Sequence, residues 1–191
     1  MGEKHNLSER DIVTKFIIPA IEESGWNKQT QLREEVSFTN GRIFVKGKKT
    51  KRGEKKRADI ILYYKPNIPV AVVEAKDNKH SVGDGMQQAL DYAETLDIPV
   101  AISSNGDGFL IQYRKNCGPL DSNNNPIIIE NADLNHFPTT EELWNCYKKY
   151  NKIENSHAEE TTLSSYFTIY YEPFREKREG FLFLLLYRHQ E

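Results

Sequence analysis

The sequence is poor in cysteine and has no long apolar run. Its two cysteines, Cys117 and Cys146, are isolated and form no C-x-x-C pair, so we expect neither a zinc site nor a disulfide framework. The longest apolar run, Phe181 to Tyr187, has seven residues, which is too short to span a bilayer. Because Met1 to His5 form no apolar signal segment, we expect a cytoplasmic protein without a membrane partner.

An excess of charge of one sign is also missing, since the formal net charge of the 191 residues is −2. Global charge therefore does not indicate a nucleic-acid binder. The positive charge is concentrated from Lys46 to Arg57, where KGKKTKRGEKKR carries eight basic residues and one acid, a local charge of +7. Such a segment can grip phosphates with an affinity that depends on salt and not on sequence. The alternative is a solvated hairpin tip.

Directly after this run, Asp59 is followed fifteen residues later by Glu74-Ala75-Lys76. The apolar runs Ile60–Tyr64 and Val70–Val73 lie between them and are joined by Lys65-Pro66-Asn67-Ile68-Pro69. Runs rich in β-branched and aromatic residues around a turn with Pro and Asn predict a β-hairpin. A turn centred on Pro66-Asn67 pairs Asp59 with Glu74 and Ile61 with Val72.

Directly opposed residues on two strands have Cβ atoms about 4.5–5.5 Å apart, so the hairpin brings Asp59 and Glu74 side by side. Two adjacent carboxylates repel each other unless a cation lies between them, and Mg²⁺ prefers such oxygen ligands, with Mn²⁺ as a possible substitute. Lys76 projects to the same strand face as Glu74, where it could hold a water or stabilise a phosphate. A salt-bridged strand end with solvated acids is the alternative.

The position of the basic run next to these acids favours contact with DNA. The predicted DNA-binding residues are Lys48, Lys49, Lys51, Arg52, Lys55, Lys56 and Arg57.

The remaining pattern predicts an α/β fold in which helices flank a mixed sheet. Ser8 with Asp11 begins a helix that Pro19 kinks and Gly25 ends. Thr139 or Thr140 caps a helix near the other end of the chain. Between them we expect strands at 32–38 and 43–45, the two hairpin strands, a helix at about 84–96, and strands at 98–102 and 109–113.

Gln88 and Tyr92 lie one turn apart on the same face of the helix predicted after Lys76. If the strand that carries Glu74 leads into this helix, the Gln amide and the Tyr hydroxyl can contact a phosphate or brace Lys76. A pair that simply packs on the sheet is the alternative. The order of these residues after the acids strengthens the catalytic interpretation.

These motifs together resemble the PD-(D/E)xK nucleases, and within them the N-terminal nuclease domain of the restriction (R) subunit of type I restriction-modification enzymes. The resemblance covers about two-thirds of the chain. It rests on Ser8-Glu9-Arg10-Asp11, Ala58-Asp59-Ile60-Ile61-Leu62, Val73-Glu74-Ala75-Lys76, Gln88-x-x-x-Tyr92, Ser104-Asn105-Gly106 and, more loosely, on residues 137–144. Ala58 stands where the motif name has Pro.

The resemblance implies a role for each matching residue. Asp59, Glu74 and the Ala75 carbonyl correspond to metal ligands, and Lys76 to the catalytic lysine. Gln88 and Tyr92 match an element associated with DNA cleavage. Glu9 matches an acid that completes the metal site in many such folds, although an acid in the first turn also simply suits the helix dipole.

One departure is large: the phosphate-loop motif G-x-x-x-x-G-K-[ST] of the family's ATP-driven motor is missing. We therefore expect residues 1–116 to form a nuclease core and residues 117–191 an extension or linker towards an absent helicase-like motor. ATP would be used only by the full-length subunit, and the chain would be inactive or weak without its motor and the methyltransferase and specificity subunits.

The predicted function is a Mg²⁺-dependent DNA endonuclease domain that cuts double-stranded DNA without local sequence specificity. The alternatives are a non-catalytic DNA-docking or assembly module of the same complex, and a stand-alone PD-(D/E)xK nuclease of repair or defence.

Overall fold

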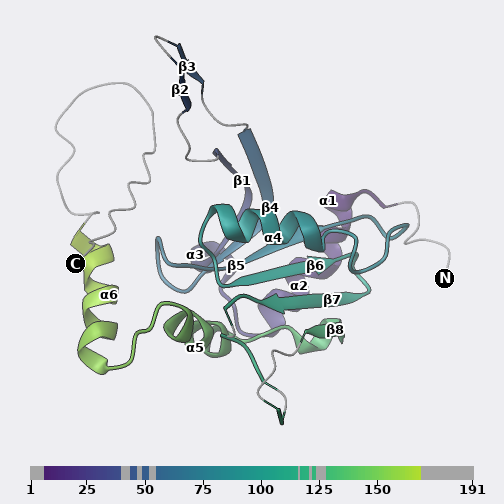
Figure 1. The fold of residues 1–191 in the computed structure, drawn as a ribbon. Coiled ribbons are helices and arrows are strands. Elements are labelled where there is room, and N and C mark those ends of the chain that lie inside the picture. The colour runs from purple at the N-terminus through teal and green to yellow at the C-terminus, as the bar shows by residue number, and fades with distance from the viewer. Residues whose placement is uncertain are drawn as a thin grey trace.

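A six-stranded mixed sheet forms the centre of the molecule, with the strand order β1-β4-β5-β6-β7-β8 (Figure 1). The structure, a computed structural model, describes residues 7–39, 44–46, 49–51, 55–115, 117–120, 122–123 and 128–168. The strands are β1 (Leu32–Thr39), β4 (Lys55–Tyr63), β5 (Pro69–Ala75), β6 (Val100–Ser104), β7 (Gly108–Tyr113) and β8 (Ile129–Asp133). The predicted α/β fold with a mixed sheet is confirmed.

The only parallel pair in this sheet joins β5 to β6, and helix α4 (Met86–Thr95) forms the crossover between them. The hairpin register agrees with the prediction, since Ile61 pairs with Val72. Its turn is also as predicted, because Ile68 N donates to Lys65 O at 3.0 Å and Asn67 adopts a φ of 67°. Two further short strands, β2 (Phe44–Lys46) and β3 (Lys49–Lys51), pair with each other.

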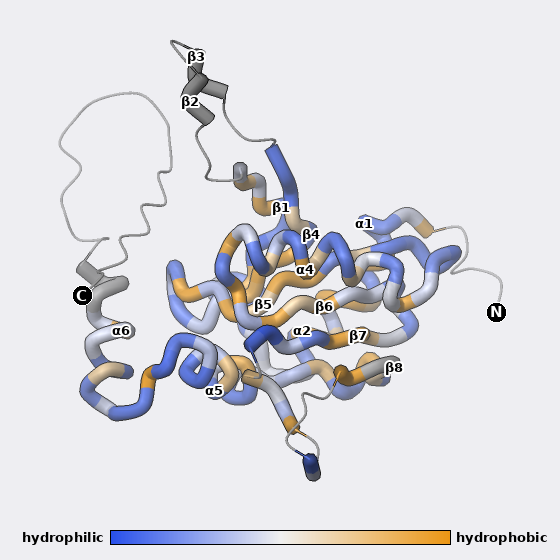
Figure 2. The backbone as a smooth tube through the Cα atoms, viewed as in Figure 1, coloured by the Kyte–Doolittle hydropathy of each residue, from blue (hydrophilic) through white to orange (hydrophobic). Residues whose placement is uncertain are grey.

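The sheet has helices on both faces. Ile61 and Val72 pack with α4 on one face, whereas Ile60 and Val73 contribute to the larger core on the other. The second face is covered by α1 (Glu9–Ile12), the π-helical turn η2 (Val13–Ile17), α2 (Ile18–Glu23) and α5 (Thr140–Tyr150). Figure 2 shows hydrophobic colour along the central strands and hydrophilic colour at the free end of β4.

The first helical segment begins and ends at the predicted residues. Ser8 Oγ accepts a hydrogen bond from Asp11 N, and the Asp11 carboxylate accepts one from Ser8 N, which completes a capping box. Gly25 ends the segment with a φ of 91°. The predicted irregularity at Pro19 takes the form of the π-helical turn, because α2 has proline in its first turn directly after η2.

The elements after β7 extend the same core. Helix α5 begins at the predicted cap, where Thr139 and Glu142 form a second capping box. The sequence pattern did not indicate α3 (Lys28–Gln31), β8, the 3-10 turn η3 (Leu134–His136) or α6 (Ser156–Thr168). Among the described residues, none of the helices is both long and apolar enough to cross a membrane.

The expectation of no disulfide is wrong, because Cys117 and Cys146 are joined by one. Cys117 follows β7 and Cys146 lies on α5, 29 residues further along the chain, yet their Cα atoms are 4.7 Å apart. A disulfide requires such proximity in space. Sequence spacing detects only pairs that are local in the chain, and here the packing of α5 against the sheet brings the two cysteines together.

Candidate active site

Asp59 and Glu74 meet where β4 and β5 run past each other. The ladder pairs Ile60 with Val73, and the two acids are the next residues on their strands. Asp59 Oδ2 accepts a hydrogen bond of 2.8 Å from Ala75 N. On its other side β5 is held by β6, because Lys76 N donates to Ser104 O at 2.8 Å. The hairpin and the parallel pair thus fix the two acids from both sides.

Glu74 is the most deeply buried charged side chain of the site, with 3% of its surface exposed. Its Oε2 is buried without a hydrogen-bond partner among the described residues. Burial, and then the nearby Asp59 carboxylate, raise the pKa of Glu74 from 4.5 to about 8, while Lys76 opposes the shift. A buried oxygen without a donor, beside a second carboxylate, suits a bound cation.

Lys76 links the carboxylates to helix α4. Its Nζ lies 3.6 Å from Glu74 Oε1 and donates to Gln88 Oε1 at 3.2 Å. Gln88 Nε2 in turn donates to the Tyr92 hydroxyl at 3.0 Å. The Tyr92 ring packs edge-on against Phe38, with a centroid distance of 5.1 Å. The structure therefore brings Lys76, Gln88 and Tyr92 into one chain of contacts that starts at Glu74.

The loop between Lys76 and α4 is held by residues that sequence reasoning missed. Ser103 Oγ donates to Val82 O at 2.6 Å and accepts from Gly85 N at 3.1 Å. A Cβ at Gly85 would lie 2.8 Å from Ser103 Oγ and 3.3 Å from Glu74 Cγ. Glycine at 85 thus lets the start of α4 approach Glu74 closely. The polar residues that end an otherwise apolar strand, Ser103 and Ser104, were the available signal.

Glu9 is not brought together with Asp59 and Glu74. It is exposed at the start of α1, which belongs to the segment that covers the sheet face opposite α4. In the part of the chain that the structure describes, no three acidic, histidine or cysteine side chains gather closely enough to hold a metal ion. The candidate ligands that do lie together are Asp59, Glu74 and the main chain of Ala75.

The basic run is described in part. Lys48 and Arg52 lie outside the described residues, and Lys49 and Lys51 belong to β3, where only the backbone is described. The side chains of Lys55, Lys56 and Arg57 on β4 line a groove of about 590 Å³ with residues of α4. Gln88 and Tyr92 line the same groove, so it adjoins the Lys76 contacts.

Comparisons with known proteins agree on one family. Residues 6–116 match the family model described as type I restriction enzyme R protein N terminus. Over 139 residues the chain is 44% identical to the type I restriction enzyme EcoAI endonuclease subunit of Escherichia coli, an alignment that covers 73% of this chain and 16% of that protein.

A solved structure is also similar, namely a fragment of an HsdR subunit of a type I restriction enzyme from Vibrio vulnificus YJ016. The TM-score is 0.62 and the identity 36%, over 83% of this chain and 28% of that chain. The chain thus spans less than a third of the length of either relative.

Proposed function

Because the chain belongs to the family of type I restriction enzyme R protein N termini, we propose that it is a Mg²⁺-dependent DNA endonuclease domain. The observation that carries the proposal is the buried, unpartnered Oε2 of Glu74 beside Asp59, with Lys76 Nζ 3.6 Å from the other Glu74 oxygen. A pair of carboxylates that only stabilised the fold would be expected to satisfy both oxygens with donors.

The residues that would hold Mg²⁺, or Mn²⁺ in its place, are Asp59, Glu74 and the Ala75 carbonyl. In an extended strand the N–H and C=O of one residue point to the same side, and Ala75 N already donates to Asp59. This geometry directs the Ala75 carbonyl towards the same edge. When bound, the ion would polarise a phosphate oxygen and lower the pKa of a water. Glu9 is not included, because among the described residues it forms no cluster with the two acids that is close enough to hold a metal ion.

The side chains of the protein would position the reacting groups. Lys76 carries a charge that can hold a water or stabilise negative charge on the phosphate. Its freedom to turn is limited, because Gln88 accepts from its Nζ and Tyr92 accepts from Gln88. We infer that Gln88 and Tyr92 act on the reaction by fixing where the lysine ammonium lies.

The substrate would be DNA cut without local sequence specificity. The basic side chains of Lys55, Lys56 and Arg57 next to the site support phosphate contacts that any sequence offers. Target choice would come from methyltransferase and specificity subunits. ATP would be used elsewhere in a full-length subunit, in keeping with the missing phosphate-loop motif.

Plasmid nicking in the presence of Mg²⁺ tests the proposal. The unaltered chain, without its motor and partner subunits, should nick weakly. Asp59→Ala and Lys76→Ala should reduce this nicking at least a hundredfold, whereas Lys149→Gln on α5 should not change it. Equal nicking by all four proteins would overturn the assignment of these residues.

Calorimetric titration with Mg²⁺ provides a second readout that does not depend on activity. We expect the unaltered chain to bind and Glu74→Ala not to bind. DNA binding and metal binding without any nicking would instead support the docking-module alternative.

A further inference from the structure

The groove between β4 and α4 has two chemically different walls. One wall consists of Lys55, Lys56 and Arg57, three consecutive basic residues of β4. The other consists of residues from the start of α4 and the loop before it, namely Asp84, Gln87, Gln88, Asp91 and Tyr92. With a volume of about 590 Å³ the groove is in the range of small-ligand sites, about 300–1,000 Å³.

The basic wall can offer its charge to a ligand. Lys56 Nζ lies over the Tyr92 ring, 5.7 Å from the centroid, and its described contacts include no carboxylate. Arg57 has one distant ion-pair partner, Glu35 Oε2 at 3.9 Å, and 61% of the Arg57 side chain is exposed. An exposed pair at such a distance contributes little. Lys56 and Arg57 are therefore available to bind phosphates.

The α4 wall presents hydrogen-bond acceptors. On α4, Asp91 is four residues after Gln87 and three after Gln88, so these three side chains share one face, and Asp84 joins them from the loop before the helix. Gln87 Nε2 donates to Asp91 Oδ1 at 3.0 Å, which turns the Gln87 carbonyl away from Asp91. Carboxylates repel phosphates but accept hydrogen bonds from the amino groups of bases, and Gln can pair with adenine.

A nucleic-acid strand has the same asymmetry, with an anionic backbone on one side and base edges on the other. We propose that this groove binds a single DNA strand, with its phosphates on Lys55, Lys56 and Arg57 and its base edges on Gln87 and Asp91. A duplex would bring a second anionic backbone towards Asp84 and Asp91. The proposal rests on the proposed function, because Gln88 belongs both to this groove and to the contacts of Lys76.

Fluorescence anisotropy in EDTA tests the groove without any cleavage. The probes are a short labelled single-stranded oligodeoxynucleotide, the same strand with abasic spacers in place of all nucleosides, and the matching duplex. We expect the unaltered chain to bind the base-bearing single strand at least fivefold more tightly than the abasic strand or the duplex. A preference for the duplex would overturn the proposal.

Two double variants separate the walls. Lys55→Gln with Lys56→Gln should weaken binding of both single strands by the same factor, about tenfold. The salt slope of the affinity should fall by about 0.7 for each lost phosphate contact. Gln87→Ala with Asp91→Ala should weaken binding of the base-bearing strand about fivefold and leave the abasic strand unchanged or tighter. Alanine favours the helical conformation, so weaker binding by this variant is not explained by unfolding of α4.

Matched controls are Lys149→Gln on α5 and Glu94→Gln on α4, neither of which lines the groove. Tighter binding of both the base-bearing and the abasic strand by the Gln87/Asp91 variant would show that α4 only repels phosphates. The proposed contact of base edges with Gln87 and Asp91 would then be wrong. Equal binding by every variant would place the strand elsewhere. Because EDTA suppresses metal-dependent cleavage, these outcomes are separate from those of the nicking experiment, which can succeed or fail independently.

Discussion

At the scale of single residues, Glu74 is the group of the site whose ionisation is most unfavourable. This carboxylate is buried beside Asp59, and Lys76 at 3.6 Å supplies opposite charge. Burying a charge without full compensation costs free energy. A protein retains such an arrangement where the charge has a use, and the proposed Mg²⁺ site would provide one.

The raised pKa of Glu74 predicts a pH-dependent stability of the metal-free protein. Its pKa is about 8 in the folded state against an ordinary value of 4.5. Between these pH values the folded protein binds more protons than the unfolded chain, so the free energy of unfolding should fall as pH rises. The fall should be on the order of 5 kcal/mol, because one pKa unit corresponds to about 1.4 kcal/mol. Urea unfolding in EDTA at several pH values measures it.

The free energy of unfolding of Glu74→Gln should not fall over this pH range, because the amide cannot ionise. Glu94→Gln, an exposed change on α4, should show the same decline as the unaltered chain. Saturating Mg²⁺ should oppose the decline in the unaltered chain by favouring the ionised carboxylate. The same pH slope in Glu74→Gln as in the unaltered chain would show that another group is responsible.

Tyr92→Phe should reduce nicking with little change in stability. The substitution removes the hydroxyl that accepts from Gln88 Nε2 and keeps the ring packed against Phe38. A hydrogen bond of this kind contributes about 1 kcal/mol, which corresponds to about fivefold in rate. Initial nicking rates and urea unfolding are the measurements. Tyr113→Phe on β7 is the control, and an equal rate for both variants would argue against a role for the Tyr92 hydroxyl.

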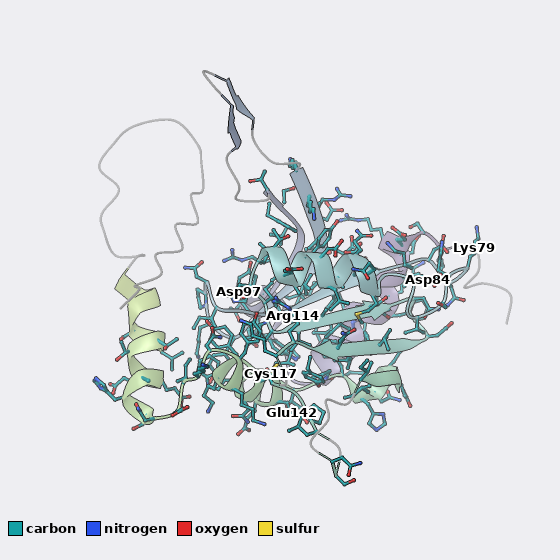
Figure 3. All side chains as sticks on the ribbon, in the orientation of Figure 1. Lys79, Asp84, Asp97, Arg114, Cys117 and Glu142 are labelled. Atoms are coloured by element: carbon teal, nitrogen blue, oxygen red, sulfur yellow. A yellow bond between two sulfur atoms is a disulfide. The ribbon has the colours of Figure 1, made fainter. Side chains whose placement is uncertain are left out.

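At the scale of elements, both ends of α4 are tied to the sheet. Its start is held through Gly85 and Ser103. At its other end, Arg114 Nη1 donates to Ala93 O in the last turn of α4 and to Ile98 O just after the helix, each at 2.8 Å. Figure 3 shows Arg114 near Asp97 at this end, whereas Asp84 lies near the start of the helix. These ties set the position of Gln88 and Tyr92 relative to Lys76.

Arg114→Ala should therefore lower the free energy of unfolding by about 2–3 kcal/mol, since it leaves two carbonyls without a charged donor. It should also slow nicking by loosening α4. Its neighbour Lys115 is a control that donates to neither carbonyl. Lys115→Ala removes an exposed ion pair with Asp97 at 4.0 Å, worth about 0–1 kcal/mol, and a contact of the ammonium with the Tyr150 ring at 4.1 Å from its centroid, worth about 0.5–1 kcal/mol at an exposed site. Equal losses in urea unfolding would contradict the role of Arg114 at the helix end.

The elements that could be predicted are those with local signals. The β4–β5 hairpin has its turn at Pro66-Asn67, and α5 has its capping box at Thr139 and Glu142. Strand β8 has the sequence IENAD, which shows no apolar alternation. It forms because β7 has an edge that is free to pair with another strand. The sequence of β8 itself does not show that such an edge is nearby.

At the scale of the whole molecule, the core continues past the expected boundary at residue 116. Phe137, Leu143, Trp144, Tyr147 and Tyr150 are buried in the core that covers the face opposite α4. The Tyr64 ring stacks on Trp144 at a centroid distance of 4.1 Å. The hairpin that carries Asp59 and Glu74 is thus supported by residues from the C-terminal part of the chain.

A chain ending at residue 116 should not unfold cooperatively, whereas a chain ending at residue 168 should. Full burial of one large apolar side chain contributes about 1.5–3 kcal/mol. Losing Phe137, Leu143 and Trp144 together therefore removes much of the roughly 5–15 kcal/mol that stabilises a small domain. The shorter chain would also leave the buried Trp26 Nε1 without Pro138 O. Circular dichroism during urea unfolding distinguishes the two, and a cooperative transition in the shorter chain would favour a boundary at 116.

The sequence by itself determined the hairpin register, the helix caps and the family resemblance, because strand alternation, turn chemistry and capping act over a few residues. Tertiary structure alone decided that Glu74 is buried with an unpartnered oxygen, that Gln88 contacts Lys76, and that Glu9 stays apart. It also joined Cys117 to Cys146. Each of these four features depends on which faces of distant segments pack together. Residue type alone therefore does not determine the chemistry of the site, because burial and proximity in space also set it.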